Sequence, residues 1–209
     1  MDFNKMKIAL SGPSGLGKTT LCKFIQKEFG VEWKSVSAGD LLNEQDKAIL
    51  YERYGYSGTG HRNVIALSNT YPRFGEDFQQ YVLDRRIELI LNHSGFVIDR
   101  SPLDNVVYML AQNGHNVSEE YIESFMNKAI NAYRYLTHLI MIKYSNDITQ
   151  IEDNDSRIPN RYYQRMISDL FQATYVRNFA SQINGPKVVT IDFWDLDQRK
   201  SLLRNFLSS

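Results

Sequence analysis

The sequence predicts an α/β fold, a single domain of three layers in which helices cover both faces of a parallel sheet. Strand-like apolar stretches alternate along the 209 residues with helical patterns, and this alternation is typical of parallel sheets flanked by helices. The chain is long enough to bury a sizeable core, and it contains no internal repeat, low-complexity run or long linker. We therefore expect one folding unit over residues 1–209.

Short apolar stretches that fit buried strands occur at intervals along the chain. They are Lys7–Leu10, Trp33–Ser37, Gly95–Asp99, His138–Lys143 and Lys187–Asp192. Between them, longer segments carry apolar residues at helical spacing. The predicted helices are Thr19–Phe29, Phe78–Leu91, Pro102–Gln112, Ser118–Leu136 and Asn160–Ile183.

A glycine-rich loop follows the first predicted strand. The stretch GPSGLGKTT, Gly12–Thr20, fits the pattern G-x-x-x-x-G-K-[ST] of a phosphate-binding loop, or P-loop. The glycines let backbone N–H groups point inward at phosphates, the lysine adds a cation, and the next hydroxyl binds Mg²⁺ at the positive end of a helix. The motif therefore predicts a P-loop NTPase fold. The predicted nucleotide-binding residues are Gly12, Ser14, Gly15, Gly17, Lys18, Thr19 and Thr20.

A second motif, GFVIDRSPLD, supplies charges for the same chemistry. Asp99 ends a predicted strand, where its carboxylate can hold Mg²⁺ through water, and Arg100 can face the phosphates. A plain ion pair between these two side chains is the alternative. Ser101, Pro102 and Asp104 fit an N-cap, a proline at the first helical position and a capping acid, so we assign them to starting a helix. The predicted catalytic and metal-binding residues of the two motifs are Lys18, Thr19, Asp99 and Arg100.

Motifs of other phosphate-binding classes are missing from the sequence. A GTPase carries N-K-x-D, but Asn127-Lys128 is followed by Ala and Ile, and the switch motif D-x-x-G does not occur. A motor or AAA+ ATPase usually needs a longer module and an acidic pair, whereas Asp99 is followed by the cation Arg100. These observations favour transfer of a phosphoryl group to another molecule over transfer to water.

The interval of about 41–94 is longer than a plain crossover needs, and we expect an acceptor-binding insertion there. Within it, Tyr51–Phe74 interleaves arginines with aromatic residues, a combination that suits a nucleobase and a phosphate. The same aromatics can instead form the core of the insertion. In the next helix, Gln79 or Gln80 can read a base edge, and Arg85 or Arg86 can reach a phosphate. The predicted acceptor-binding residues are Arg73, Phe74, Gln79 and Arg85.

Asp40 follows the second predicted strand, beside the P-loop in this architecture. If the acceptor is an alcohol, this carboxylate can orient the hydroxyl and take its proton. If the acceptor is a phosphate, no base is needed, and Asp40 would instead hold a Mg²⁺-bound water. An N-cap role is compatible with both, because Asp40 precedes Leu41-Leu42 and has Asn43 at the third position. We expect a catalytic role for Asp40.

Residues of about 150–165 are expected to form an arginine lid. Acidic, amide and proline residues before position 160 indicate a loop, and Arg157, Arg161 and Arg165 are spaced by four. A loop tipped with arginine can close over a triphosphate and exclude water. A solvated basic helix face is the alternative for Arg161 and Arg165. We expect catalytic roles for Arg157 and Arg161.

These motifs together resemble the P-loop nucleoside and nucleotide kinases. The resemblance rests on GPSGLGKTT, VSAGDLL (Val36–Leu42), FVIDRSPLD (Phe96–Asp104) and the lid-like DNDSRIPNRYYQR (Asp153–Arg165). The chain looks most similar to the AAA-type kinase-like group that includes nicotinamide riboside kinases and many phage proteins. The resemblance of these segments implies a five-stranded parallel core of order 2-3-1-4-5 and an ATP–Mg²⁺ donor. It leaves the acceptor open.

Composition limits the partners of the protein. Lys+Arg and Asp+Glu both number 24, so no overall basic field attracts nucleic acid or an acidic membrane surface. No apolar run approaches the roughly 20 residues of a membrane span, and MDFNKMK leads directly into the first strand. We therefore expect a cytoplasmic protein with no signal peptide, in keeping with its lone cysteine, Cys22. The histidines lack metal-ligand spacing, so we assign no zinc site. A homodimer stays open.

Three functions are compatible with the sequence. The leading hypothesis is an ATP-dependent kinase of a nucleotide or nucleoside. The second is a kinase that phosphorylates a hydroxymethylated base within DNA, an activity among phage relatives of this fold. Neutral composition disfavours it, although the basic stretch Tyr51–Phe74 within the insertion keeps it open. The third is a non-catalytic nucleotide-binding regulator, against which Lys18, Thr19, Asp99 and a lid argue together.

Overall fold

The computed structural model describes residues 2–34, 38–58, 61–145 and 160–209. Its centre is a five-stranded parallel sheet with the strand order β2-β3-β1-β4-β5. The strands are β1 (Lys7–Ser11), β2 (Glu32–Lys34), β3 (Phe96–Asp99), β4 (His138–Ile142) and β5 (Lys187–Ile191). The α/β class, the parallel sheet and the strand order implied by the resemblance are confirmed.

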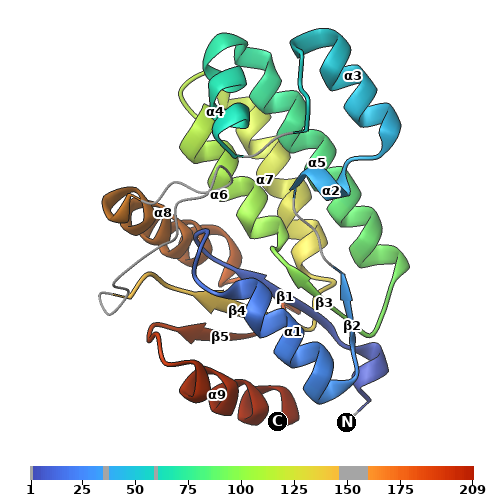
Figure 1. Ribbon diagram of the computed structural model, residues 1–209, viewed down its shortest axis with the longest axis vertical. Helices are drawn as coiled ribbons and strands as arrows, with labels where there is room; N and C mark the ends of the chain where they lie inside the picture. Colours follow the sequence, from blue (N-terminus) through green and yellow to red (C-terminus); the bar gives the residue numbers. More distant parts are fainter. Residues whose placement is uncertain (1, 35–37, 59–60, 146–159) are drawn as a thin grey trace.

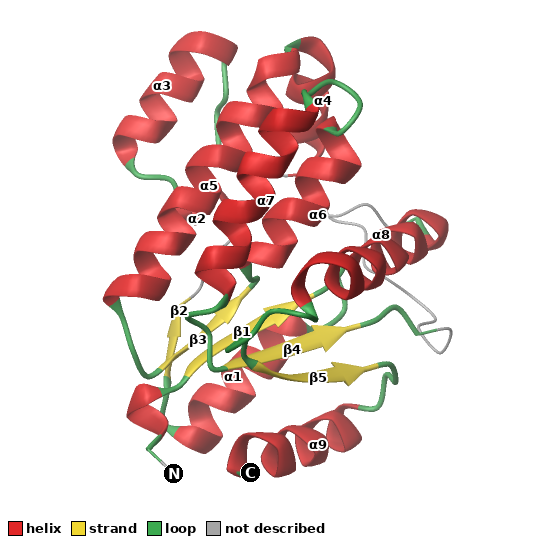
Figure 2. Ribbon diagram, turned by 180° about the vertical axis from the view of Figure 1, so that it is seen from behind, coloured by secondary structure: helices red, strands yellow, loops and turns green. Residues whose placement is uncertain are grey.

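The two faces of the sheet are covered by different helices. One face packs against α1 (Lys18–Phe29) and α9 (Leu196–Ser208). The other face packs against α5 (Pro72–Asn92), α6 (Pro102–Asn113), α7 (Glu119–Tyr133) and α8 (Arg161–Thr174). Figure 2 shows the first pair below the sheet and the second group above it. The layers are those of the predicted three-layer sandwich.

Alternation along β1 produces these two cores. Ile8 and Leu10 enter the core beneath α1 and α9, whereas Ala9, between them, enters the core on the opposite face. Neighbouring residues of a strand point to opposite sides of a sheet, and a strand at the centre must be apolar on both. All three side chains are fully buried. The continuous apolar run in the sequence therefore specifies a central strand.

Several boundaries differ from the predictions. The helix predicted to start at Phe78 begins at Pro72, which takes the first helical position, where the missing N–H of proline costs nothing. The predicted helix Asn160–Ile183 is α8 followed by a π-helical turn, η2 (Tyr175–Phe179). The pattern analysis missed α9, whose mixture of polar and charged residues conceals the buried Leu203 and Leu207. Among the described helices, none is both long and apolar enough to cross a bilayer.

Residues between β2 and β3 fold into the expected helical insertion. Its helices are α2 (Ala38–Leu41), α3 (Glu44–Tyr54) and α4 (His61–Thr70), which pack with the first half of α5. Figure 1 shows α3 and α4 at the end of the molecule remote from α9. The insertion has a core of its own that includes Leu50, Tyr56, Phe74 and Phe78. Its aromatic residues thus have the structural role that the sequence allowed as an alternative.

Helix caps settle two of the predicted assignments. Ser101 and Asp104 form the predicted capping box of α6, in which Ser101 Oγ accepts from Leu103 N and Ser101 N donates to Asp104 Oδ2. The N-cap role that the sequence allowed for Asp40 is not found. Asp40 lies inside α2, and Asn43 caps α3 in a box with Asp46.

Candidate active site

The P-loop joins β1 to α1 as the motif requires. Gly12, Gly15 and Gly17 all have positive φ, at 136°, 81° and 81°, a backbone region that side chains disfavour. At Gly12 a Cβ would also lie 2.2 Å from the carbonyl oxygen of Ile142. The loop therefore closes against the end of β4, and this contact requires a glycine.

Lys18 is the first residue of α1, and its side chain folds back into the loop. The ammonium donates to the carbonyl oxygens of Gly12 at 2.9 Å and Pro13 at 2.6 Å. The residue is 5% exposed, and burial, reinforced by the charge of Arg100, lowers the pKa of the amine. The loop thus encloses a cation that its own backbone holds in place.

Thr19 and Asp99 meet at the start of α1. The Thr19 hydroxyl donates to Asp99 Oδ2 at 2.6 Å, because the parallel register places Asp99 beside Leu10, two residues before the loop. The other oxygen, Asp99 Oδ1, is buried and has no hydrogen-bond partner among the described residues. A hydroxyl and a carboxylate are ligands that suit Mg²⁺. The described part of the chain contains no cluster of three or more histidine, cysteine or acidic side chains suited to a metal.

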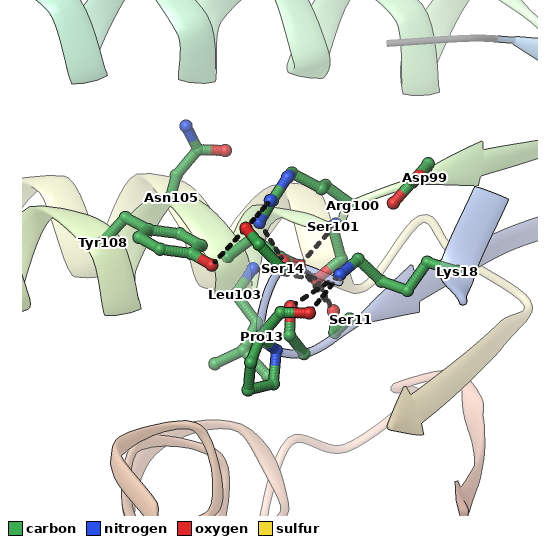
Figure 3. Close-up of polar contacts among 12 residues, drawn as sticks. Ser11, Pro13, Ser14, Lys18, Asp99, Arg100, Ser101, Leu103, Asn105 and Tyr108 are labelled. Atoms are coloured by element: carbon green, nitrogen blue, oxygen red, sulfur yellow. Dashed lines mark hydrogen bonds and ion pairs between the residues drawn. The ribbon is translucent and has the colours of Figure 1, made fainter. Parts of the chain in front are cut away.

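Arg100 leaves the end of β3 with a strained backbone, at φ 115°. Its guanidinium donates to Ser14 Oγ of the P-loop at 2.9 Å and to Asp104 Oδ1 at 3.2 Å, and it lies 4.8 Å from the ring centroid of Tyr108 (Figure 3). Burial acts to lower the pKa of Arg100, but Tyr108 and the carboxylates of Asp104 and Asp99 raise it above its usual range. Its ion pair is therefore with Asp104, and not the simple pair with Asp99 that the sequence allowed.

The C-terminal helix also contacts the P-loop. Arg199 of α9 is 2% exposed and donates to the carbonyl oxygen of Leu16, inside the loop, at 2.8 Å. Its Nε donates to the carbonyl oxygen of Phe193 at 2.7 Å, and Trp194 covers its guanidinium at 4.8 Å. Burial lowers the pKa of Arg199. Sequence analysis did not identify this contact, because it joins residues at the two ends of the chain.

A buried polar cluster lies where α5 meets α6. Arg86 is 1% exposed and donates to Asn105 Oδ1 and, at 3.3 Å, to the carbonyl oxygen of Ser101. Asn105 in turn donates to Gln79 Oε1 at 3.3 Å. Burial lowers the pKa of Arg86 to about 10. Its Nε and second terminal nitrogen have no hydrogen-bond partner among the described residues.

Other predicted acceptor residues lie in different surroundings. Arg85, next to the buried Arg86, is partly exposed and donates to Asp46 at 2.7 Å and to Glu88 at 2.9 Å. Phe74 is 0% exposed within the aromatic core of the insertion. Arg73 is exposed at the start of α5. Of the predicted set, Gln79 belongs to the buried polar cluster.

Asp40 lies on α2 with its residue exposed. The hydroxyl of Tyr56 is close to this short helix, since a Cβ at Gly39 would lie 3.5 Å from it. Burial, and then the charge of Asp40, raise the pKa of Tyr56. The ring of Tyr56 therefore lies in the insertion core, and its hydroxyl lies close to α2, the helix that carries Asp40.

The structure describes part of the segment that we expected to form a lid. Residues 146–159, and with them Arg157, lie outside the described residues. Arg161 is the first residue of α8, is exposed, and lies 5.0 Å from the ring of Tyr162. Arg165 lies 6.0 Å from the ring of Tyr144, which follows β4.

Sequence reasoning missed several residues that the fold brings together. They are Tyr56, Asn105, Tyr108 and Arg199, while Arg86 was left as the alternative to Arg85. Gln79 and Arg86 are seven residues apart, which is two helical turns and one face of α5. That spacing was a usable signal in favour of Arg86 over Arg85. The others depend on contacts between elements, which no local pattern records.

Comparison with known proteins agrees with this geometry. The profile of a family described as AAA domain matches residues 7–184. A deoxyadenosine kinase from M. mycoides, with the products dCMP and a flexible dCDP bound, is similar in structure, with a TM-score of 0.64 and 18% sequence identity over 97% of this chain and 98% of that chain. The same enzyme with bound dATP has a TM-score of 0.62 and 18% identity over 98% of this chain and 100% of that chain.

A thymidylate kinase from Ehrlichia chaffeensis has a TM-score of 0.55 and 17% identity, over 99% of this chain and 99% of that chain. No curated protein matches the sequence. At these identities the likeness to solved structures shows the fold, while the matched profile shows the family. The chain therefore belongs to the AAA-domain family whose profile covers residues 7–184, and it has the fold of the deoxyadenosine and thymidylate kinases.

Proposed function

We propose that this protein is an ATP-dependent kinase that transfers the γ-phosphoryl group of ATP to a nucleotide or nucleoside. The observation that carries the proposal is the 2.6 Å contact between the P-loop hydroxyl of Thr19 and the Asp99 carboxylate. Thr19 and Asp99 would hold Mg²⁺, and the buried Asp99 Oδ1 with no partner among the described residues supports this role. When bound, the ion neutralises charge on the phosphate oxygens.

The residues of the loop would bind and orient the donor. Lys18 supplies a cation inside the P-loop, and Arg100 reaches the loop through Ser14. Phosphoryl transfer asks little covalent chemistry of a protein, so catalysis depends on positioning and on stabilising charge. Arg157 and Arg161 would complete the site as arginines of the lid. These roles extend the sequence predictions and are part of the proposal.

For the acceptor we propose the polar cluster of Gln79, Arg86 and Asn105. Arg86 donates to the carbonyl oxygen of Ser101, directly after Arg100, so the cluster continues from the phosphate-binding residues. A buried guanidinium with two unpartnered nitrogens among the described residues is costly without an acceptor atom to bind. Two amides and a guanidinium offer donors and acceptors that match the edge of a nucleobase. Arg86, rather than Arg85, is therefore our candidate.

Asp40 is our candidate for the group that orients an attacking hydroxyl. Its exposed position on α2 leaves it accessible to an acceptor, and it lies close enough to raise the pKa of Tyr56. The nearby phenol and the insertion core would hold α2 in place. With a nucleoside acceptor, Asp40 would take the proton of the hydroxyl.

The surface charges support a small acceptor over DNA. Two arginines of the insertion are engaged in ion pairs, Arg53 with Asp77 at 3.0 Å and Arg85 with Asp46 at 2.7 Å. Overall charge is balanced, with 24 basic and 24 acidic residues. A DNA kinase would need a basic path for the backbone, and its activity would fall steeply with salt.

The proposal is tested by offering labelled ATP with a panel of nucleosides, nucleotides and hydroxymethylated duplex DNA. We expect label in a nucleoside or nucleotide, with weak salt dependence. Lys18→Ala should abolish transfer, because it removes the loop cation. Transfer of label to modified DNA alone would establish the second function, and normal turnover by folded Lys18→Ala would refute the assignment of the P-loop.

Asp99→Asn should lower kcat by a factor on the order of 10², since Asn keeps the shape but loses the charge that holds Mg²⁺. The measurement is a Mg²⁺ titration of initial rate, with thermal unfolding followed in parallel. A variant that unfolds at lower temperature but keeps its specific activity would make Asp99 a structural residue instead.

Arg86→Met should raise the acceptor KM by about 10- to 100-fold, because charge-assisted contacts are lost while the apolar volume is kept. The matched control is Arg85→Met, at the neighbouring position. It removes an ion pair with Asp46 and Glu88, so we expect lower thermal stability and an unchanged acceptor KM. The reverse pattern, with KM affected by Arg85 alone, would restore the original sequence prediction.

Asp40→Asn distinguishes the two acceptor classes. With a nucleoside, turnover should fall by roughly 10²–10⁴-fold at similar ATP affinity, since the base for the hydroxyl is lost. With a monophosphate the loss should be smaller, because the nucleophile is already ionised. Equal rates of the variant and the wild-type protein with both classes would remove Asp40 from the mechanism.

A further inference from the structure

Asp104 has contacts that a helix cap does not need. Its residue is 1% exposed, and its Oδ2 accepts from Ser101 N at 2.8 Å, as the capping box requires. The same oxygen accepts from the Ser11 hydroxyl at 2.7 Å, and Oδ1 accepts from Arg100 at 3.2 Å. One buried carboxylate therefore receives donors from the cap, from β1 and from the guanidinium beside the P-loop.

These contacts connect two points of the P-loop region through Asp104. Ser11 is the last residue of β1 and directly precedes Gly12. Arg100, which Asp104 holds on one side, donates on the other side to Ser14 Oγ at 2.9 Å. Ser11 and Ser14 thus lie on either side of Gly12 and Pro13, whose carbonyl oxygens accept from Lys18. The carboxylate fixes both ends of the segment that orients the loop lysine.

Two arginines depend on the charge of the Asp104 carboxylate. It attracts two arginines, Arg100 and Arg86, and its charge acts to raise the pKa of both. Removing one partner of a buried ion pair leaves the other charge uncompensated, which costs more than the pair contributes. Arg100 also has a strained backbone, at φ 115°, and such strain persists when surrounding contacts hold the residue.

We propose that Asp104 is a positioning residue that holds the P-loop and Arg100 in the geometry for phosphoryl transfer. The proposal rests on the kinase function proposed above and adds a residue to it. Asp104 acts through Ser11 and Arg100 and touches neither substrate. Its neighbour Asn105 holds Arg86, so the first turn of α6 organises the donor side through Asp104 and the acceptor side through Asn105.

The chain offers a matched control for a merely structural role. Asp46 occupies the same position in the capping box of α3, and its side chain is 4% exposed and paired with Arg85 at 2.7 Å. Asp46 therefore resembles Asp104 in three respects: each closes a capping box, each is buried, and each is paired with an arginine. Its partners Asn43 and Arg85 belong to the insertion and not to the P-loop.

The test compares Asp104→Asn with Asp46→Asn. Asparagine keeps the shape, but its amide cannot accept from all the donors around Asp104. We expect kcat to fall by about 10- to 100-fold with the acceptor KM within about threefold, because displaced catalytic groups cost rate more than binding. Asp46→Asn should lower the unfolding temperature comparably and leave kcat unchanged. If the two variants lose stability alike and both keep kcat, Asp104 is a cap and the proposal fails.

Two further measurements identify the route. In an Arg100→Ala background, Asp104→Asn should lower kcat by a smaller factor than it does in the wild-type protein, because residues that act through one another are non-additive and only the contact with Ser11 remains to be lost. Full additivity would contradict the proposal. Ser11→Ala, which leaves the cap of α6 intact, should lower kcat in the same direction and provides the test if Asp104→Asn does not fold. An unchanged kcat in Ser11→Ala would then overturn the link to β1.

Hydrogen exchange keeps this test separate from the proposed function. In Asp104→Asn, the P-loop amides of residues 12 and 14–17 should exchange faster than in the wild-type protein, while the same amides in Asp46→Asn should not. This readout needs no activity. Suppose that the wild-type protein transfers phosphate to no acceptor, but that P-loop amides exchange faster in Asp104→Asn than in the wild-type protein. The kinase function would then fail, and the positioning role of Asp104 in the loop would stand. Unchanged exchange in Asp104→Asn would overturn the positioning role itself.

Discussion

Gly12 lies where β1 leaves the sheet, and there the backbone passes so close to Ile142 that a Cβ would come within 2.2 Å of its carbonyl oxygen. This contact depends on β1 and β4 being neighbours in register, with Ser11 beside Met141. It determines where the P-loop starts and in which direction it curls. Lys18 and Thr19 then enter α1 at a fixed distance from the end of β3, so Thr19 reaches Asp99. The proposed metal ligands are thus a consequence of strand order.

Among the described residues around the P-loop, positive charges outnumber the carboxylates that act on them. Lys18, Arg86 and Arg100 lie within the buried region, and Asp99 and Asp104 are the carboxylates that act on them. Burial lowers the pKa of Lys18 and Arg86, which means that their charged forms are held at a cost. Phosphate groups would relieve that cost, because they bring negative charge and hydrogen-bond acceptors into the same space. The electrostatics of the core therefore agree with the proposed nucleotide chemistry.

The insertion combines an aromatic interior with a polar contact to α6. Phe74 packs against Tyr54, Tyr56 and Phe78 with ring centroids 5.4–5.8 Å apart, and these contacts join α3 and the residues after it to α5. On this support, Tyr56 approaches α2, which carries Asp40, and Gln79 approaches Asn105 of α6. Aromatic residues that the sequence suggested as acceptor contacts thus hold in place the residues that we propose for the acceptor.

The sequence alone determined the P-loop, the parallel α/β class and the Asp99–Arg100 motif, because each depends on residues adjacent in the chain. Apolar runs specify strands, and the glycines and lysine of GPSGLGKTT fit one backbone path. Tertiary structure decided which of two adjacent arginines is buried: Arg86 faces α6, while one helical step of 100° turns Arg85 toward Asp46 and Glu88. It likewise gave Asp104 its contact with Ser11, 93 residues away in the chain, and brought Arg199 to Leu16 across 183 residues. Such contacts arise from the packing of whole helices and strands, and a local pattern of side chains carries no record of the partner.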